Sequence, residues 1–229
     1  LPSERRGDEL WGRGTVDMKG GVAVLLWLAR HLDAPIHDVT WIFYDLEEVE
    51  ASRNGLGRLA KSRPELLSGD FAILGEPSNA IIEGGCNGTL RVEVTTRGTR
   101  AHSARSWMGV NAIHGAHAIL ERLATYSPET VHVDGLDYRE GMNAVAIRGG
   151  IAGNVIPDEC TVEVNYRFAP SKSEAEALGV VQRLFSEFDL AVTDISGGAR
   201  PGADSPLAQS FIDAVGGRIA PKFGWTDVA

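Results

Sequence analysis

Apolar and polar positions in residues 1–85 switch between a helical and a strand-like pattern. Residues 20–32 carry apolar side chains at helical spacing, and residues 55–62 also favour a helix. Residues 39–44 and 71–74 are short apolar runs, the first with β-branched and aromatic residues, which are typical of buried strands. Strands that alternate with helices predict a mostly parallel, twisted sheet with helices on its faces.

A different pattern follows between residues 88 and 196. It predicts the order β-α-β-β-α-β, with strands at 90–96, 144–151, 160–168 and 190–195 and helices at 110–123 and 173–188. This order is typical of a ferredoxin-like domain. A helix from Ser205 and a strand at 219–223 would return to the first sheet. We therefore expect an α/β protein with the parallel-sheet domain in residues 1–86 and 198–229, and an inserted ferredoxin-like domain in residues 87–197.

Composition narrows the classes of function. The net charge of −9 and the pI near 5.2 lack the basic footprint of a nucleic-acid-binding protein and disfavour an anionic membrane surface. The longest apolar run, residues 22–29, is far shorter than the roughly 20 residues that span a bilayer. An acidic protein that binds an anionic small molecule needs a local group of basic side chains.

The cysteines and the chain ends add two expectations. Cys86 and Cys160 lack metal-ligand spacing and are expected to be reduced, packed thiols, which together with the lack of a visible signal peptide predicts a cytoplasmic protein. The chain begins at Leu1 and stops at Ala229 directly after a turn, so the first domain is expected to be truncated at both ends.

Four acidic residues occupy loops of the first domain. Asp17 lies in a glycine-bracketed loop before a predicted helix, Glu47 and Glu48 follow residues 39–44, and Glu76 follows residues 71–74. Ligands of open α/β sheets bind beyond the carboxyl ends of the strands. Carboxylates held together there repel one another unless a divalent cation such as zinc, cobalt or manganese is bound. Spacing alone leaves open the alternative that these are ordinary loop residues, with Asp17 placed favourably at a helix start.

Motifs in one consistent order identify a resemblance. The segments are Gly12-Arg-Gly-Thr-Val-Asp-Met-Lys-Gly20, Glu47-Glu48, Gly75-Glu-Pro-Ser78, Thr99-Arg-Ala-His-Ser103, Gly153-Asn-Val-Ile-Pro-Asp158 and Asn165-Tyr-Arg167. They resemble the central and lid motifs of the M20 family of dinuclear zinc peptidases and deacylases. The resemblance covers essentially the whole chain. It is greatest to the actinobacterial branch that hydrolyses N-succinyl-LL-2,6-diaminopimelate, which implies a small N-succinylated amino acid as substrate.

The resemblance implies a role for each carboxylate. Asp17 matches the aspartate that bridges two Zn²⁺ ions, for which Co²⁺ or Mn²⁺ are alternatives, and the peptide after it is cis in relatives. Glu47 matches the general base, and Glu48 and Glu76 match ligands of one zinc each. Each zinc of the family also takes a histidine, one before the glycine-rich loop and one near the C-terminus. His31 and His37 follow Asp17, so the chain as given lacks both expected histidine ligands.

The inserted domain matches the family's lid, through which relatives form homodimers. His102 matches the histidine that reaches the partner subunit's active site and hydrogen-bonds the developing oxyanion. Asn154 and Arg167 match substrate-binding residues, and Arg100 and Arg105 flank His102, where they would bind substrate carboxylates. A solvated turn is the alternative for His102. His114 and His117, three residues apart on a predicted helix, are interpreted as packing or surface residues.

Three other interpretations stay open at this point. The chain could be another M20 enzyme, such as an acetylornithine deacetylase-like protein or an aminoacylase. It could be a catalytically incomplete fragment that dimerises and binds ligand. It could also be a plain α/β binding protein, which predicts no dependence on metal.

Overall fold

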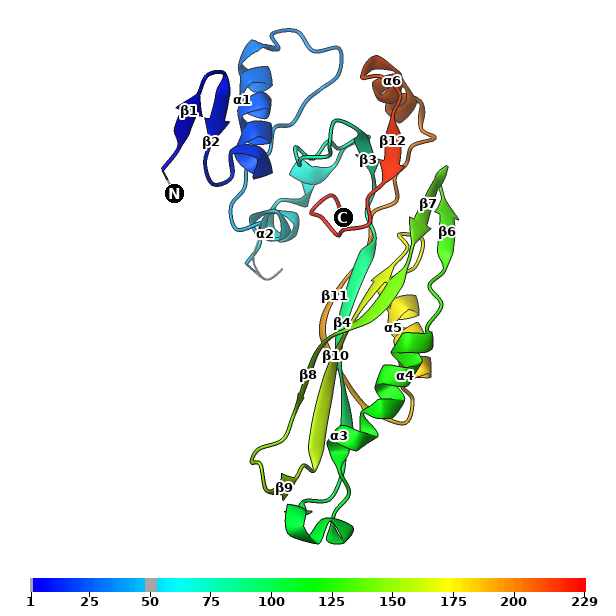
Figure 1. Ribbon diagram of the computed structural model, residues 1–229. Helices are drawn as coiled ribbons and strands as arrows, with labels where there is room; N and C mark the ends of the chain where they lie inside the picture. The colour runs from blue at the N-terminus through cyan, green and yellow to red at the C-terminus, as the bar shows by residue number, and fades with distance from the viewer. Residues whose placement is uncertain (1, 48–52) are drawn as a thin grey trace. The chain divides into compact units, whose positions relative to one another are not determined.

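The computed structural model describes residues 2–47 and 53–229, and the chain divides into two compact units (Figure 1). The first contains Leu1–Ile82 with Val228, and the second contains Glu83–Asp227 with Ala229. None of the helices in the described ranges is long and apolar enough to cross a membrane.

The first unit begins with an antiparallel hairpin of β1 (Glu4–Arg6) and β2 (Glu9–Trp11). An irregular turn at Thr15–Gly20 leads into helix α1 (Gly21–His31), and helix α2 (Gly55–Ser62) is followed by a short helical turn at Pro64–Leu67. Both predicted helices are therefore confirmed. The side chain of Asn54 caps α2, since its Oδ1 accepts hydrogen bonds from two backbone amides of the first turn.

The strand predictions for residues 39–44 and 71–74 are wrong. Both segments are described, and neither is assigned to a strand or is fully buried. A strand is stabilised by a hydrogen-bonded neighbour and by a covered face. Among the described residues before β3, the hairpin β1–β2 is the one sheet, and the apolar side chains of α1 stay largely exposed, Trp27 at 61%. The two runs therefore lack both sources of stabilisation.

The second unit is built on a four-stranded antiparallel sheet in the order β11-β4-β10-β8. Its strands are β4 (Gly88–Arg97), β8 (Gly141–Gly149), β10 (Glu159–Phe168) and β11 (Asp189–Ser196). Helices α3 (Ala112–Gly115) and α4 (His117–Thr125) connect the first two strands, and α5 (Glu174–Leu184) connects the last two. The ferredoxin-like order is therefore confirmed.

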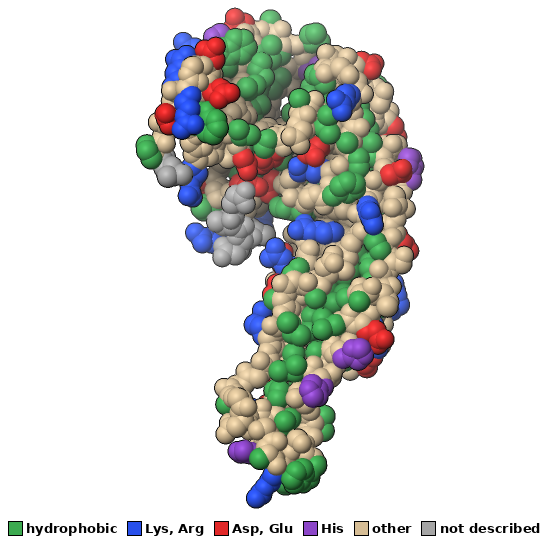
Figure 2. All heavy atoms as spheres, in the orientation of Figure 1, with side chains coloured by type: hydrophobic (Ala, Val, Ile, Leu, Met, Phe, Trp, Pro, Cys, Tyr) green, Lys and Arg blue, Asp and Glu red, His purple; other side chains and the backbone are tan. Residues whose placement is uncertain are grey.

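Alternation along the strands explains the core of this unit. Side chains of β4 and β10 are buried at every second position, where Val92, Val94, Val162 and Val164 pack with Ile119 of α4 and Val181 of α5. The opposite face of the sheet carries exposed residues, among them Val145 and Ile147 of β8 and Val192 of β11. Hydrophobic side chains also run along the visible face of this unit in Figure 2.

Smaller elements complete the second unit. They are β3 (Ile82–Gly84), the two-residue strands β5 (Ala101–His102) and β9 (Val155–Ile156), the hairpin of β6 (Thr130–Val133) and β7 (Leu136–Arg139), helix α6 (Pro206–Ala214) and β12 (Ile219–Pro221). β12 pairs with β3. Directly after β12, the Lys222 amide donates a hydrogen bond to the Gly84 carbonyl, and the Lys222 carbonyl accepts one from the Asn87 amide.

Candidate functional site

The loop that carries Asp17 is held by its own glycines and polar groups. Gly14 has a φ of 72°, a conformation that glycine adopts without a steric penalty. Its carbonyl accepts a hydrogen bond from the Lys19 amide at 2.8 Å, and the Lys19 ammonium donates to the Arg13 carbonyl at 3.0 Å. The Asp17–Met18 peptide is cis, which confirms the expectation drawn from the resemblance. Asp17 itself is exposed.

The start of α1 packs directly on the loop that carries Glu76. A Cβ at Gly21 would lie 2.0 Å from the carbonyl oxygen of Gly75, so only a residue without a side chain allows this approach. Met18 and Leu25 also reach Gly75, at 3.5 Å and 3.0 Å from an ideal Cβ at that position. The structure thus brings the Asp17 loop and the Glu76 loop into contact.

Glu47 follows a backbone segment that α2 holds in place. The Gly55 amide donates to the Asp45 carbonyl at 2.9 Å, and the Arg58 guanidinium pairs with the Asp45 carboxylate at 2.6 Å. Between Asp45 and Glu47, Leu46 has a φ of 58°, which is uncommon for a residue with a side chain. Glu48 lies outside the described residues.

These carboxylates fit a metal in type but do not close a site. Aspartate and glutamate oxygens are suitable ligands of zinc and of similar divalent cations. Within residues 2–47 and 53–229, however, no three His, Cys, Asp or Glu side chains gather closely enough to hold a metal ion. The contact between Gly21 and Gly75 places two of the candidate loops together, and the described residues alone leave the ligand set incomplete.

His102 lies on β5, and Asn154 lies directly before the neighbouring strand β9. β5 pairs with β9 so that His102 is opposite Val155, and the Ser103 amide donates to the Asn154 carbonyl at 2.9 Å. The imidazole Nδ1 accepts a hydrogen bond from the Ala104 amide at 3.1 Å. In a neutral ring this leaves the proton on Nε2, so the exposed His102 presents an N–H donor to a ligand.

Arg100 and Arg105 differ in their surroundings. The Arg100 guanidinium donates to Asp158 Oδ1 at 2.9 Å and lowers the pKa of that carboxyl. Arg105 is exposed in the turn Ser103–Met108, next to His102. Both arginines were predicted to bind substrate carboxylates. Arg100 already has an anionic partner, Asp158, within the chain.

Arg167 lies near the end of β10, whereas Asp158, which pairs with Arg100 close to His102, lies directly before its start. The two residues are nine positions apart, which at about 3.3 Å per residue corresponds to roughly 30 Å. The Nε of Arg167 donates to Asn165 Oδ1 at 3.1 Å, and burial together with the charge of Arg91 lowers the pKa of Arg167. The second unit thus brings His102 and Asn154 together and keeps Arg167 apart from them.

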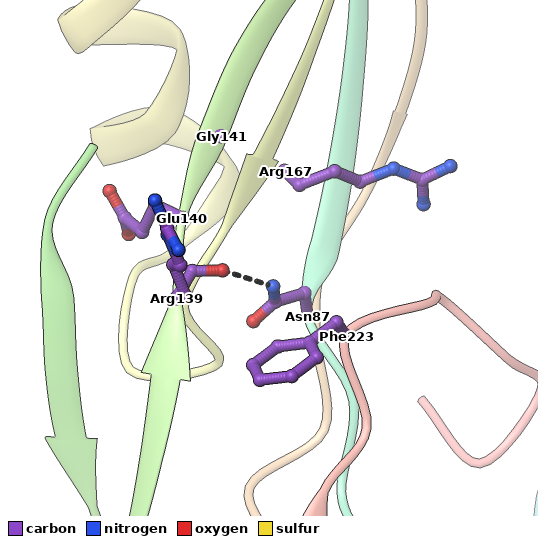
Figure 3. Close-up of a pocket in the computed structure, with 6 residues that line it drawn as sticks. All are labelled: Asn87, Arg139, Glu140, Gly141, Arg167 and Phe223. Carbon is purple, nitrogen blue, oxygen red and sulfur yellow. Dashed lines mark hydrogen bonds between the residues drawn. The ribbon is translucent and has the colours of Figure 1, made fainter. Parts of the chain in front are cut away.

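A cavity of about 260 Å³ adjoins Arg167 (Figure 3). It is lined by Asn87, Arg139, Glu140, Gly141, Arg167 and Phe223. Sequence reasoning did not find Asn87 or Arg139, because an asparagine after Gly85-Cys86 and an arginine in a hairpin strand carry no motif of their own.

The sequence of this chain is similar to that of known peptidases and desuccinylases. Residues 85–193 match the family model of the M20-type peptidase dimerisation domain. Over its full length the chain is 52% identical to a protein of Mycobacterium tuberculosis named as a candidate succinyl-diaminopimelate desuccinylase. It is 46% identical to the succinyl-diaminopimelate desuccinylase of Corynebacterium glutamicum. Residues 85–193 therefore belong to the M20-type peptidase dimerisation family.

Solved structures of peptidases show the same fold. A Staphylococcus aureus tripeptidase aligns over 99% of this chain and 63% of its own, with a TM-score of 0.69 and 20% identity. An M20 metallo-carboxypeptidase of Sulfolobus solfataricus aligns over 98% and 67%, with a TM-score of 0.68 and 14% identity. These likenesses confirm the α/β class with an inserted domain. The chain spans about 65% of the length of the Mycobacterium relative and 64% of the Corynebacterium one.

Proposed function

We propose that this M20 chain belongs to a metal-dependent amidohydrolase that cleaves N-succinyl-LL-2,6-diaminopimelate into succinate and LL-diaminopimelate. The observation that carries the proposal is the identity of 52% and 46%, over the whole chain, to relatives that bear the name of this desuccinylase. The reaction is a step in the synthesis of diaminopimelate and lysine.

The metal site is assigned to the acidic loops of the first unit. In the proposal Asp17, Glu48 and Glu76 would hold two Zn²⁺ ions, for which Co²⁺ or Mn²⁺ could substitute. The close packing of Gly21 on Gly75 supports it, because this packing joins the Asp17 and Glu76 loops. Zinc bound there would polarise the amide carbonyl and lower the pKa of water.

Glu47 is proposed as the general base. It would take a proton from the attacking water and return it to the amine that leaves, as a positioned carboxylate does in general acid–base catalysis. The left-handed backbone at Leu46, held by the contacts of Asp45 with α2, supports a fixed direction for the next side chain.

His102 is proposed to donate its Nε2–H to the oxyanion that forms on the amide carbonyl, with Asn154 beside it. The acceptor role of Nδ1 toward the Ala104 amide supports this tautomer. The separation from Arg167 along β10 argues that His102 serves the active site of a second copy. A homodimer formed through the lid domain follows, and the match of residues 85–193 to a dimerisation domain supports it.

Arginines are proposed to bind the substrate carboxylates. Arg167 lies half-buried beside a cavity, and a bidentate carboxylate is the natural partner of a guanidinium there. Arg105 and Arg100 would add positive charge near His102, with Arg100 exchanging Asp158 for the substrate. These groups offset the net charge of −9 of the chain.

The proposal also includes the domain bounds and the cellular location of the protein. Residues 1–86 and 198–229 are proposed as the catalytic domain and residues 87–197 as the lid. Both cysteines are buried and free, which supports a cytoplasmic location.

Hydrolysis by the full-length protein, followed as release of LL-diaminopimelate, tests the proposal. Glu47→Gln should keep the zinc content and abolish turnover, whereas Glu65→Gln, an exposed change in the same unit, should keep both. Faster turnover of acetylornithine, or of an N-acetyl amino acid, than of the succinylated substrate would instead favour the acetylornithine deacetylase-like or aminoacylase alternative. Less than one tightly bound metal per chain, with no hydrolysis, would favour a dimerising protein without activity.

A further inference from the structure

The side chain of Asn165 holds the guanidinium of Arg167 on the face of the four-stranded sheet that lies opposite its helices. Its Oδ1 accepts a hydrogen bond from Arg167 Nε at 3.1 Å. Its Nδ2 donates to Thr89 Oγ1 at 3.1 Å and to the Leu90 carbonyl at 3.4 Å. Because Nε can only donate and a carbonyl can only accept, one orientation of the carboxamide satisfies both contacts. Asn165 thus ties Arg167 of β10 to the backbone of β4.

The hydrogen bond at Nε leaves the end of the Arg167 guanidinium open. Within residues 2–47 and 53–229, neither Nη1 nor Nη2 of Arg167 donates a hydrogen bond, and neither is a buried atom without a partner. Both nitrogens are therefore reachable from solvent. Figure 3 shows the guanidinium pointing away from Glu140 and Arg139. A carboxylate can approach it end-on, with one oxygen on Nη1 and the other on Nη2.

A second arginine explains why Arg167 needs such a restraint. Arg91 is directly opposite Asn165 in the pairing of β4 with β10, so it lies on the same face of the sheet. Burial and the charge of Arg91 lower the pKa of Arg167, and the charge of Asp194 acts in the opposite direction. Repulsion from Arg91 would turn an unrestrained Arg167 aside. A guanidinium that is fixed beforehand loses less conformational entropy when an anion binds.

We propose that Asn165 is a positioning residue, which holds Arg167 so that a substrate carboxylate binds end-on to Nη1 and Nη2. This inference rests on the proposed function, in which Arg167 binds a carboxylate of N-succinyl-LL-2,6-diaminopimelate. Asn165 acts through Arg167 and does not touch the substrate. The carboxylate is bound in the same way before and during cleavage of the amide, so loss of Asn165 weakens substrate binding and leaves the chemical step unchanged.

Steady-state kinetics of the full-length protein test the inference. Asn165→Ala should raise KM about 3- to 10-fold and change kcat by less than about 2-fold. Thr161→Ala is the control, because it removes another side-chain hydrogen bond between β10 and β4, at 3.0 Å to Thr95, and it should change neither constant.

A second pair of variants separates positioning from a general structural role. In an Arg167→Lys background the guanidinium fork is gone, so Asn165→Ala should not raise KM further. Thr89→Val, which removes one anchor of Asn165, should raise KM by a smaller factor than Asn165→Ala.

Three kinetic results would overturn the inference: a KM of Asn165→Ala equal to that of Thr161→Ala, a fall in kcat in place of the rise in KM, or a further rise in KM on top of Arg167→Lys. If Asn165→Ala does not fold, nitrogen NMR of the Arg167 side chain in the unmodified protein decides. Adding succinate and LL-diaminopimelate should shift the Nη signals and leave the Nε signal in place. A shift at Nε alone, or at none of the three nitrogens, would reject the positioning role.

The two proposals can fail separately. Hydrolysis of the succinylated substrate with an unchanged KM in Asn165→Ala would reject this inference alone. Nη signals that respond to the two compounds, in a protein that does not hydrolyse the succinylated substrate, would reject the proposed function alone.

Discussion

Gly21 approaches the carbonyl oxygen of Gly75 so closely that a Cβ on residue 21 would lie 2.0 Å from it. Gly21→Ala must therefore push the start of α1 away from the Glu76 loop. We expect a loss of about 1–3 kcal/mol in the free energy of unfolding and a lower zinc content of the full-length protein. Urea unfolding and elemental analysis measure these changes. Gly69→Ala, whose Cβ would make an ordinary contact at 3.8 Å, is the control, and equal behaviour of both variants would contradict the prediction.

His102 gives a second prediction, which concerns the partner subunit. His102→Ala in the full-length protein should lower kcat by about 10²–10³, because it removes an oxyanion donor. His132→Ala, at an exposed histidine paired with Asp137, should leave kcat unchanged.

Mixing the variants shows which subunit His102 serves. Heterodimers of His102→Ala and Glu47→Gln should regain activity, since one of their two sites then combines an intact Glu47 with an intact His102. If the mixture stays as inactive as its components although heterodimers form, His102 acts within its own chain.

Glu140 anchors the end of the four-stranded sheet that borders the cavity beside Arg167. This carboxylate is 4% exposed and accepts hydrogen bonds from the Tyr166 hydroxyl at 2.7 Å, the Ala169 amide at 2.8 Å and the Lys172 ammonium at 2.7 Å. Glu140→Ala removes the acceptor that these three donors share, so we expect a loss of about 3–5 kcal/mol in the free energy of unfolding. Glu129→Ala removes the exposed second partner of Lys172 and should cost less than about 1 kcal/mol. Similar denaturation midpoints for both variants would argue against the buried network.

The pair of Arg100 and Asp158 gives a prediction about pH. The hydrogen bond from Arg100 lowers the pKa of Asp158, so the folded-state pKa lies below the unfolded one. The stabilisation is then present above the unfolded pKa and is lost as the pH falls through the lowered, folded-state value. Arg100→Met should raise the pKa of Asp158 in a carboxyl NMR titration, whereas Arg148→Met should not. A substrate carboxylate that takes Arg100 should also raise it; an unchanged pKa with bound substrate would remove Arg100 from the binding site.

The four-stranded sheet of the second unit and its helices could be predicted from the sequence because their signals are local. Strict alternation in β4 and β10 marks half-buried strands, and the helical runs around them fit one order. The helix predicted from residue 110 begins at Ala112 instead, since Val110 bridges to Thr99 and Asn111 caps the helix. The hairpin β6–β7 was missed although Asp134-Gly135, both with positive φ, is a strong turn signal between alternating strands.

The first unit and the site were harder to predict because they depend on partners. Residues 39–44 have the composition of a strand, but strand formation also needs a neighbour that composition does not reveal. Motifs predicted which carboxylates belong to the site, namely Asp17, Glu47 and Glu76. They could not predict the approach of Gly21 to Gly75, because it depends on packing between segments more than 50 residues apart. The pairing of Arg100 with Asp158 likewise joins residues that are 58 positions apart in sequence.

The strand order of the four-stranded sheet has a consequence for how the genes of such proteins can gain or lose this segment. β4 opens the sheet and β11 closes it, yet the two are neighbours, with Thr89 opposite Ser196 and Cys86 bridged to Ala199. The part of the chain from β4 to β11 thus begins and ends on adjacent strands, which lie about 5 Å apart. A gene could therefore gain or lose the whole segment from β4 to β11 at one loop, and a tight turn would be enough to join the two ends where it was lost.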